Sequence, residues 1–132
     1  MRVLGVDYGI KRIGVAIGES EVSMGFARNV ILGSGTPELD ARLVADFSRS
    51  EGCDVVLVGL PYLESGDEGE QVRLTREFAE HLQGLCVRVE FWDERYTTAS
   101  ARSNLAHVEP GKRKRLLDSE AARIMVTEYL AH

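Results

Sequence analysis

The first 32 residues hold three apolar stretches that are separated only by short turns. Such a short connection cannot carry the chain across a sheet, so strands joined in this way must run antiparallel. The pattern therefore predicts an antiparallel meander formed by residues Arg2–Tyr8, Arg12–Glu19 and Met24–Leu32.

After the meander, helical and strand patterns alternate. The run DVVLVGL, closed by Pro61, is continuously apolar, which is typical of a strand buried on both faces. Such alternation predicts an α/β domain with a mixed sheet, in which parallel strands extend the meander and helices cover both faces. We expect strands at 54–60 and 87–92, helices at 37–49, 70–83, 97–105 and 118–130, and loops at 62–69 and 107–115.

The length and composition limit the class of protein. A chain of 132 residues is long enough for one domain with a real core, and we expect residues 1–132 to form a single domain. No apolar run approaches the roughly 20 residues of a membrane span. Asp7 and the pair Lys11-Arg12 interrupt the region that a signal peptide needs to be apolar, so we expect a cytoplasmic protein. A net charge of −5 disfavours a generic basic nucleic-acid binder but not a local binding site.

Acidic residues stand where the predicted elements begin or end. Asp7 closes the first strand, and Asp118 begins the final helix. Asp93 and Glu94 close the last strand. In an open α/β sheet, strand ends that point the same way bring together residues that are distant in sequence. Clustered carboxylates repel one another unless a cation neutralises them, and Mg²⁺ and Mn²⁺ prefer oxygen ligands. The spacing is therefore compatible with a metal-dependent nuclease.

Each acid also has a purely structural explanation. An aspartate at the end of a strand often forms a turn, which applies to Asp7. Asp93 can cap the next helix or pair with Arg95, and Asp118 suits the cap of the final helix. Spacing alone leaves both kinds of explanation open.

Four motifs follow one another along nearly the whole chain. They are VLGVDYGIKRIGVAIG at the start, VVLVGLP, DER followed by Thr97-Thr98 and Ala101-Arg102, and DSEAA in the predicted last helix. Together they resemble the YqgF family, also called RuvX. The resemblance implies a ribonuclease H-like fold of the resolvase type and divalent-metal nuclease chemistry. It also implies a role in ribosome biogenesis, the maturation of the 5′ end of pre-16S rRNA.

The resemblance also implies which residues are catalytic. By motif position, Asp7, Glu94 and Asp118 are the catalytic acids and metal ligands, with Asp93 as the alternative to Glu94. They would hold two Mg²⁺ or Mn²⁺ ions, which activate a water and stabilise the leaving oxygen. Related resolvases often carry an acid at the end of the strand that here reads Val58-Gly59-Leu60-Pro61, so the DER motif must supply the middle carboxylate.

A nucleic acid needs cations beside the metals, because phosphates dominate its affinity for protein. Basic residues adjoin each of the acids in sequence, and aromatic residues nearby could stack on unpaired bases. The candidate phosphate ligands are Lys11, Arg12, Arg95, Arg102, Lys112, Arg113, Lys114 and Arg115, and the candidate stacking residues are Tyr8, Tyr62, Trp92 and Tyr96, although Trp92 suits core packing better.

Other functions compete with a pre-16S rRNA nuclease. A Holliday junction resolvase acting on branched DNA would need a symmetric dimer, and the sequence leaves a monomer and a homodimer open. A non-catalytic ribosome-assembly factor would bind RNA through the basic run 112–115. An actin-like ATP-binding domain would use the Asp7-Tyr8-Gly9 turn, but it needs a second lobe for which this chain is too short.

Overall fold

The computed structural model describes residues 1–62, 65, 69–94 and 110–131, and of residues 110–118 only the backbone. The strands are β1 (Arg2–Asp7), β2 (Arg12–Glu19), β3 (Met24–Leu32), β4 (Val55–Leu60) and β5 (Val89–Asp93). The helices are α1 (Pro37–Ser50), α2 (Glu70–Gly84) and α4 (Pro110–Leu130). Among the described helices, each is too short or too polar to cross a lipid bilayer.

The five strands form one mixed sheet in the order β3-β2-β1-β4-β5. β1, β2 and β3 pair antiparallel, while β4 pairs parallel with both β1 and β5. The short turns inside the meander enforce the antiparallel pairs, and the helical connections allow the parallel ones. The α/β fold class predicted from sequence is confirmed, with β1 at the centre of the sheet.

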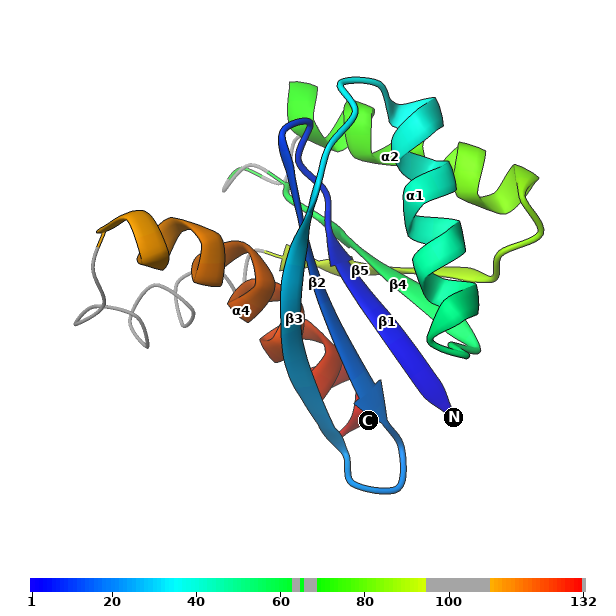
Figure 1. Ribbon diagram of the computed structural model, residues 1–132, viewed down its shortest axis with the longest axis vertical. Coiled ribbons are helices and arrows are strands. Elements are labelled where there is room, and N and C mark those ends of the chain that lie inside the picture. The colour runs from blue at the N-terminus through cyan, green and yellow to red at the C-terminus, as the bar shows by residue number, and fades with distance from the viewer. Residues whose placement is uncertain (63–64, 66–68, 95–109, 132) are drawn as a thin grey trace.

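Helices cover both faces of this sheet, as Figure 1 shows. Leu4 and Val6 of β1 point toward α1 and α2, where Phe78 and Val44 complete a larger core cluster. Val3 points to the opposite face and packs with Met125 of α4 in a second cluster. The alternation of β1 thus assigns even-numbered side chains to the α1 and α2 face and odd-numbered ones to the α4 face.

Glycines let α4 approach the sheet closely. A Cβ on Gly5 would collide with Val126 Cγ2 and lie 3.1 Å from the carbonyl oxygen of Ala122. A Cβ on Gly18, which pairs with Val3, would collide with Val126 and Leu130. As α4 runs from Ala122 to Leu130 it therefore passes from Gly5 toward the amino end of β1, so its earlier residues lie toward the Asp7 end.

Gly5→Ala is expected to destabilise the protein by about 1–3 kcal/mol, because the added methyl group overpacks the contact with Val126. The measurement is the free energy of unfolding in urea at constant m-value. Unchanged stability would contradict the close packing of α4 on β1.

Two predicted boundaries differ from the structure by more than one residue. The final helix begins at Pro110 instead of Asp118, which turns residues 110–115 from a predicted loop into helix and places Asp118 inside the helix and not at its cap. Proline suits the first position of a helix, and the Lys-Arg run that follows consists of good helix formers. Strand β5 begins at Val89 because the amide of Val87 bonds to the carbonyl of Leu82 at the end of α2. The predicted helix 97–105 and most of the loop 62–69 lie outside the described residues.

Candidate nuclease active site

Asp7 lies at the carboxyl end of β1, on the face that α4 covers. It is half-buried and follows Gly5 by two residues, so the alternation of the strand gives both positions the same face. Gly14 of β2 is its partner across the antiparallel pair. Asp7 is therefore a carboxylate at a central strand end, where open α/β sheets place their functional groups.

The side chain of Glu94 lies across Gly59 of β4. A Cβ on Gly59 would meet Cγ and Cδ of Glu94 at 2.5 Å and its Oε1 at 2.8 Å. The parallel register pairs Val6 with Val58, so the next step along both strands sets Gly59 beside Asp7. Neighbouring strands are about 4.8 Å apart. Glu94, only 4% exposed, thus points its carboxylate across β4 toward the strand that carries Asp7.

Asp93 belongs to the other face of the sheet. Phe91 lies beneath the guanidinium of Arg76 in α2, 6.0 Å from it, whereas the Trp92 ring meets Tyr129 of α4 edge-on at 6.4 Å. Because side chains alternate along β5, Asp93 lies on the same face as Phe91, and Glu94 lies on the same face as Trp92. Of the two acids that the sequence leaves open, the structure brings Glu94 and not Asp93 onto the face that holds Asp7.

Asp118 approaches this face through the backbone of α4; its side chain lies outside the described residues. Residue 118 is one helical turn before Ala122, whose carbonyl faces Gly5. Four helical residues span about 6 Å, and the two strand residues from Gly5 to Asp7 span about 6.6 Å. Since both steps run toward the same end of the sheet, the helix brings position 118 to the level of Asp7.

The donor chemistry fits a hard divalent cation. Asp7 and Glu94 offer carboxylate oxygens from adjacent positions on one face, and two such charges repel one another unless a cation lies between them. Among the side chains that the structure describes, no group of three His, Cys, Asp or Glu residues is placed for a metal ion. The two described carboxylates are thus oxygen donors of the kind that such a cation prefers, and the backbone of α4 brings position 118 to the same level.

Two of the predicted phosphate ligands, Lys11 and Arg12, have described side chains, and both follow the carboxyl end of β1. Lys11 is exposed in the turn that follows β1, and Arg12 is half-buried on the face shared with Ala16 and α4. Within the described part of the chain, Nη1 of Arg12 is buried without a hydrogen-bond partner. The backbone of residues 112–115 lies in the first turns of α4, which project beyond β3 in Figure 1. Arg95 and Arg102 lie outside the described residues.

Tyr8 does not serve as a stacking surface for bases, as the sequence analysis had suggested. Its side chain is 3% exposed and stacks on Phe78 in the α1 and α2 layer. Trp92, in contrast, packs against the cluster beneath α4, as expected. Gly59 is a residue that sequence reasoning missed, although a glycine inside an apolar strand is itself a signal of close approach.

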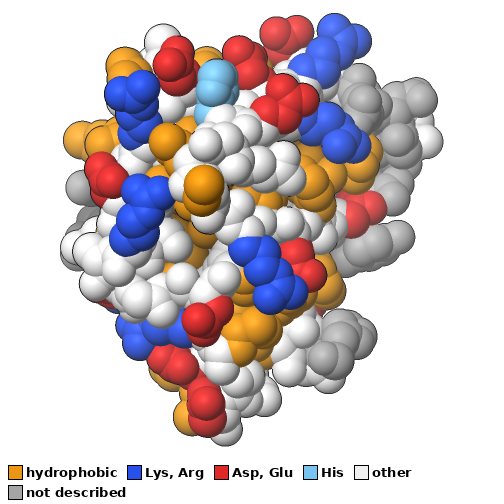
Figure 2. All heavy atoms as spheres, turned by 90° about the vertical axis from the view of Figure 1, so that its right-hand side faces the viewer, with side chains coloured by type: hydrophobic (Ala, Val, Ile, Leu, Met, Phe, Trp, Pro, Cys, Tyr) orange, Lys and Arg blue, Asp and Glu red, His pale blue; other side chains and the backbone are white. Residues whose placement is uncertain are grey.

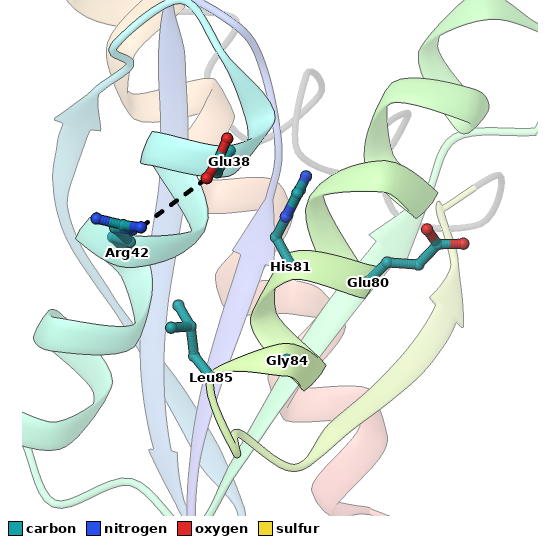
Figure 3. Close-up of a pocket in the computed structure, with 6 residues that line it drawn as sticks. All are labelled: Glu38, Arg42, Glu80, His81, Gly84 and Leu85. Carbon is teal, nitrogen blue, oxygen red and sulfur yellow. Dashed lines mark ion pairs between the residues drawn. The ribbon is translucent and has the colours of Figure 1, made fainter.

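The opposite side of the molecule offers a different surface. In Figure 2 acidic and basic side chains are interspersed there with hydrophobic ones. A hollow of about 210 Å³ lies between α1 and α2 and is lined by Glu38, Arg42, Glu80, His81, Gly84 and Leu85. Figure 3 shows that Glu38 pairs with Arg42 on α1, while Glu80 points away from α1. Acidic and basic side chains thus occur together around this hollow, with Glu38 paired to Arg42.

Comparisons with known proteins identify the family of this chain. The sequence profile of the RuvX family, described as Holliday junction resolvase, matches residues 1–132. A Thermus thermophilus protein named "Putative pre-16S rRNA nuclease" is 38% identical, covering 99% of this chain and 98% of that protein. A protein of the same name from Halothermothrix orenii is 36% identical, covering 98% of this chain and 94% of that protein.

Solved structures extend the comparison to the fold. T. thermophilus RuvC in complex with a Holliday junction substrate superposes with a TM-score of 0.60 at 15% identity, covering 99% of this chain and 94% of that one. A second T. thermophilus RuvC structure gives a TM-score of 0.55 at 16% identity, covering 98% and 94%. RuvC has a ribonuclease H-like fold, and the mixed sheet described above shares it. The chain therefore belongs to the RuvX family and has a ribonuclease H-like fold.

Proposed function

We propose that this protein is a divalent-metal-dependent endonuclease that hydrolyses phosphodiester bonds in pre-16S rRNA. The observation that carries the proposal is the Glu94 side chain lying across Gly59, on the face and at the strand end where Asp7 lies. The names of the RuvX relatives support the choice of substrate. Residues 1–132 then act as one nuclease domain, in the cytoplasm, on ribosome assembly intermediates.

In this proposal Asp7, Glu94 and Asp118 would hold two Mg²⁺ or Mn²⁺ ions. Bound ions of this kind supply an activated water and stabilise the departing oxygen of the phosphodiester. The chain contributes the rest of the site. Burial of Glu94 fixes its carboxylate, and the unpartnered Nη1 of Arg12 is a donor suited to a phosphate oxygen.

The remaining cations bind the backbone of the substrate in this proposal. Lys11 lies in the turn next to the site, and the basic run at 112–115 precedes Asp118 by one to two helical turns. Arg95 and Arg102 follow Glu94 in sequence. Each basic group is therefore close in sequence to a proposed metal ligand. This arrangement suits contacts with the phosphates of a nucleic-acid strand bound at the metals.

The decisive assay incubates the protein with Mn²⁺ or Mg²⁺ and three substrates in parallel. These are unstructured single-stranded RNA, RNA that carries the ends of pre-16S rRNA, and a four-way DNA junction. We expect cleavage of the pre-16S ends that stops when EDTA is added. Cleavage of the junction alone would overturn the proposed substrate, and no cleavage with either metal would overturn the nuclease itself.

Junction resolution is the second candidate, because the RuvX profile carries that description. Resolution requires two strands to be cut symmetrically, so it requires two active sites in one dimer. A monomer in sedimentation at assay concentration, together with cleavage of RNA, would exclude it.

Replacing Lys112, Arg113, Lys114 and Arg115 together with glutamine is expected to weaken RNA binding. Each lost phosphate contact reduces the slope of log affinity against log salt by about 0.7 for a single strand. The measurement is RNA affinity at several salt concentrations, with Arg42→Gln, which removes a single cation from the outer face, as the surface control. If affinity falls and the wild-type protein cuts no substrate with any metal, a non-catalytic assembly factor replaces the nuclease.

A further inference from the structure

Tyr8, the residue directly after Asp7, contacts helices α1 and α2 at three points. Its hydroxyl donates to Oδ2 of Asp40 at 2.6 Å, and its ring stacks on Phe78 with centroids 4.3 Å apart and planes 11° apart. Its carbonyl oxygen accepts a hydrogen bond from Nε2 of Gln71 at 2.8 Å. Both the side chain and the backbone of Tyr8 are therefore fixed by α1 and α2.

Asp40 is the buried centre of these contacts. It lies in the first turn of α1 with no exposed surface. Besides the Tyr8 hydroxyl, it accepts hydrogen bonds from the amide and the hydroxyl of Ser34, at 2.6 Å and 2.8 Å.

Stability alone does not explain this polar cluster. A buried carboxylate and phenol can often be replaced by apolar side chains of similar shape with little loss, because the net gain from a buried hydrogen bond is small. Hydrogen bonds depend on orientation, so these bonds fix the orientation of Tyr8 as well as its burial. A fixed Tyr8 in turn restricts the orientation of its neighbour in the chain, Asp7.

We propose that Tyr8, Asp40 and Gln71 are positioning residues for the carboxylate of Asp7, an inference that rests on the proposed function. Successive side chains of a strand point to opposite faces, so fixing Tyr8 in the α1 and α2 layer turns Asp7 toward α4. Asp7 ends β1, where a strand would otherwise be free to twist or fray. The hydrogen bonds to Asp40 and Gln71 and the stacking on Phe78 restrict that motion. Residues that hold a metal ligand in position are typically worth about 10–100-fold in metal affinity or activity.

Tyr8→Phe is the sharpest variant, because it keeps the ring on Phe78 and removes only the hydroxyl. Ser34→Ala is its matched control, since it also takes one hydroxyl from Asp40 but on the side away from β1. Both variants are compared with the wild-type protein at a temperature where all three are fully folded. The readouts are Mn²⁺ affinity by electron paramagnetic resonance, amide hydrogen exchange of residues 6–9, and kcat and KM on cleaved RNA.

We expect Tyr8→Phe to bind Mn²⁺ about tenfold more weakly, to exchange faster at residues 6–9 and to lose kcat with little change in KM. Ser34→Ala should show the wild-type affinity and kcat despite a similar loss of thermal stability. Gln71→Leu removes the hydrogen bond to the carbonyl oxygen of Tyr8 and should also weaken Mn²⁺ binding.

Equal Mn²⁺ affinity in Tyr8→Phe and the wild type would overturn the positioning role, while leaving the nuclease proposal intact if Asp7→Asn still loses Mn²⁺. Equal weakening in Tyr8→Phe and Ser34→Ala would also overturn it, because the effect would then follow stability. A wild-type protein that binds no Mn²⁺ and cuts no RNA would instead reject the proposed function, and the positioning role with it.

Discussion

Asp7→Asn is expected to lower metal-dependent cleavage by about 10³-fold. A metal ligand supports several kcal/mol of transition-state stabilisation, and about 4 kcal/mol corresponds to this factor. The substitution keeps the shape of a half-buried side chain at the strand end, so the melting temperature should change little. The measurement is single-turnover cleavage of pre-16S RNA ends at saturating Mn²⁺, with thermal unfolding recorded on the same sample.

Asp93→Asn is the matched control for this variant. It removes the same charge at another strand end, but on the α2 face according to the alternation of β5. We expect it to retain cleavage. Cleavage by Asp7→Asn at the wild-type rate would reject the proposed active site, and loss of cleavage in Asp93→Asn would reject the choice of Glu94 as the middle ligand.

Gly59→Ala is expected to reduce cleavage by about 10²-fold without removing any functional group. Its methyl group would lie 2.5 Å from Cγ and Cδ of Glu94, so the carboxylate must move away from its place beside β1. A displacement of about 1 Å at a catalytic group can cost this much. The glutamate side chain bends to make room, and the cost in stability should be about 1–3 kcal/mol.

Two controls separate displacement from instability. Gly84→Ala makes the same substitution where no atom lies within 4 Å of the added carbon, and should leave both activity and stability nearly unchanged. Val44→Ala empties buried space in the α1 layer and should cost about 0.5–3 kcal/mol while cleavage persists. If Gly59→Ala cleaves as well as Val44→Ala, the contact with Glu94 does not matter for activity.

Local signals predicted most of the sheet. The short turns of the meander decide the direction of β1, β2 and β3, and the run that ends at Leu60 is a buried strand whatever surrounds it. Helix α1 was equally clear, because Thr36 caps it and Pro37 begins it. These elements depend on residues close together in sequence, which is the information that a single sequence carries.

The site was harder to predict because it depends on contacts between distant segments. The structure brings Glu94 across Gly59 of the intervening strand, and the pairing of β4 with β5 that allows this contact joins segments about 30 residues apart. Tyr8 looked like an exposed aromatic beside an acid, yet Asp40, 32 residues later, buries it. The early start of α4 was missed because the basic run was interpreted by its charge and not by its helix propensity.

The close contacts of α4 with the sheet also set the position of its basic run. The helix has 21 residues, and the backbone of the basic run lies about 10–15 Å along the helix axis from Ala122, whose carbonyl faces Gly5. A change of about 5° in the tilt of the helix about Ala122 would move the basic run by about 1 Å and position 118 by about half as much. Substitutions at Gly18 or Leu130, where the helix packs closely on β2, should therefore alter the affinity for nucleic acid more than they alter the chemistry.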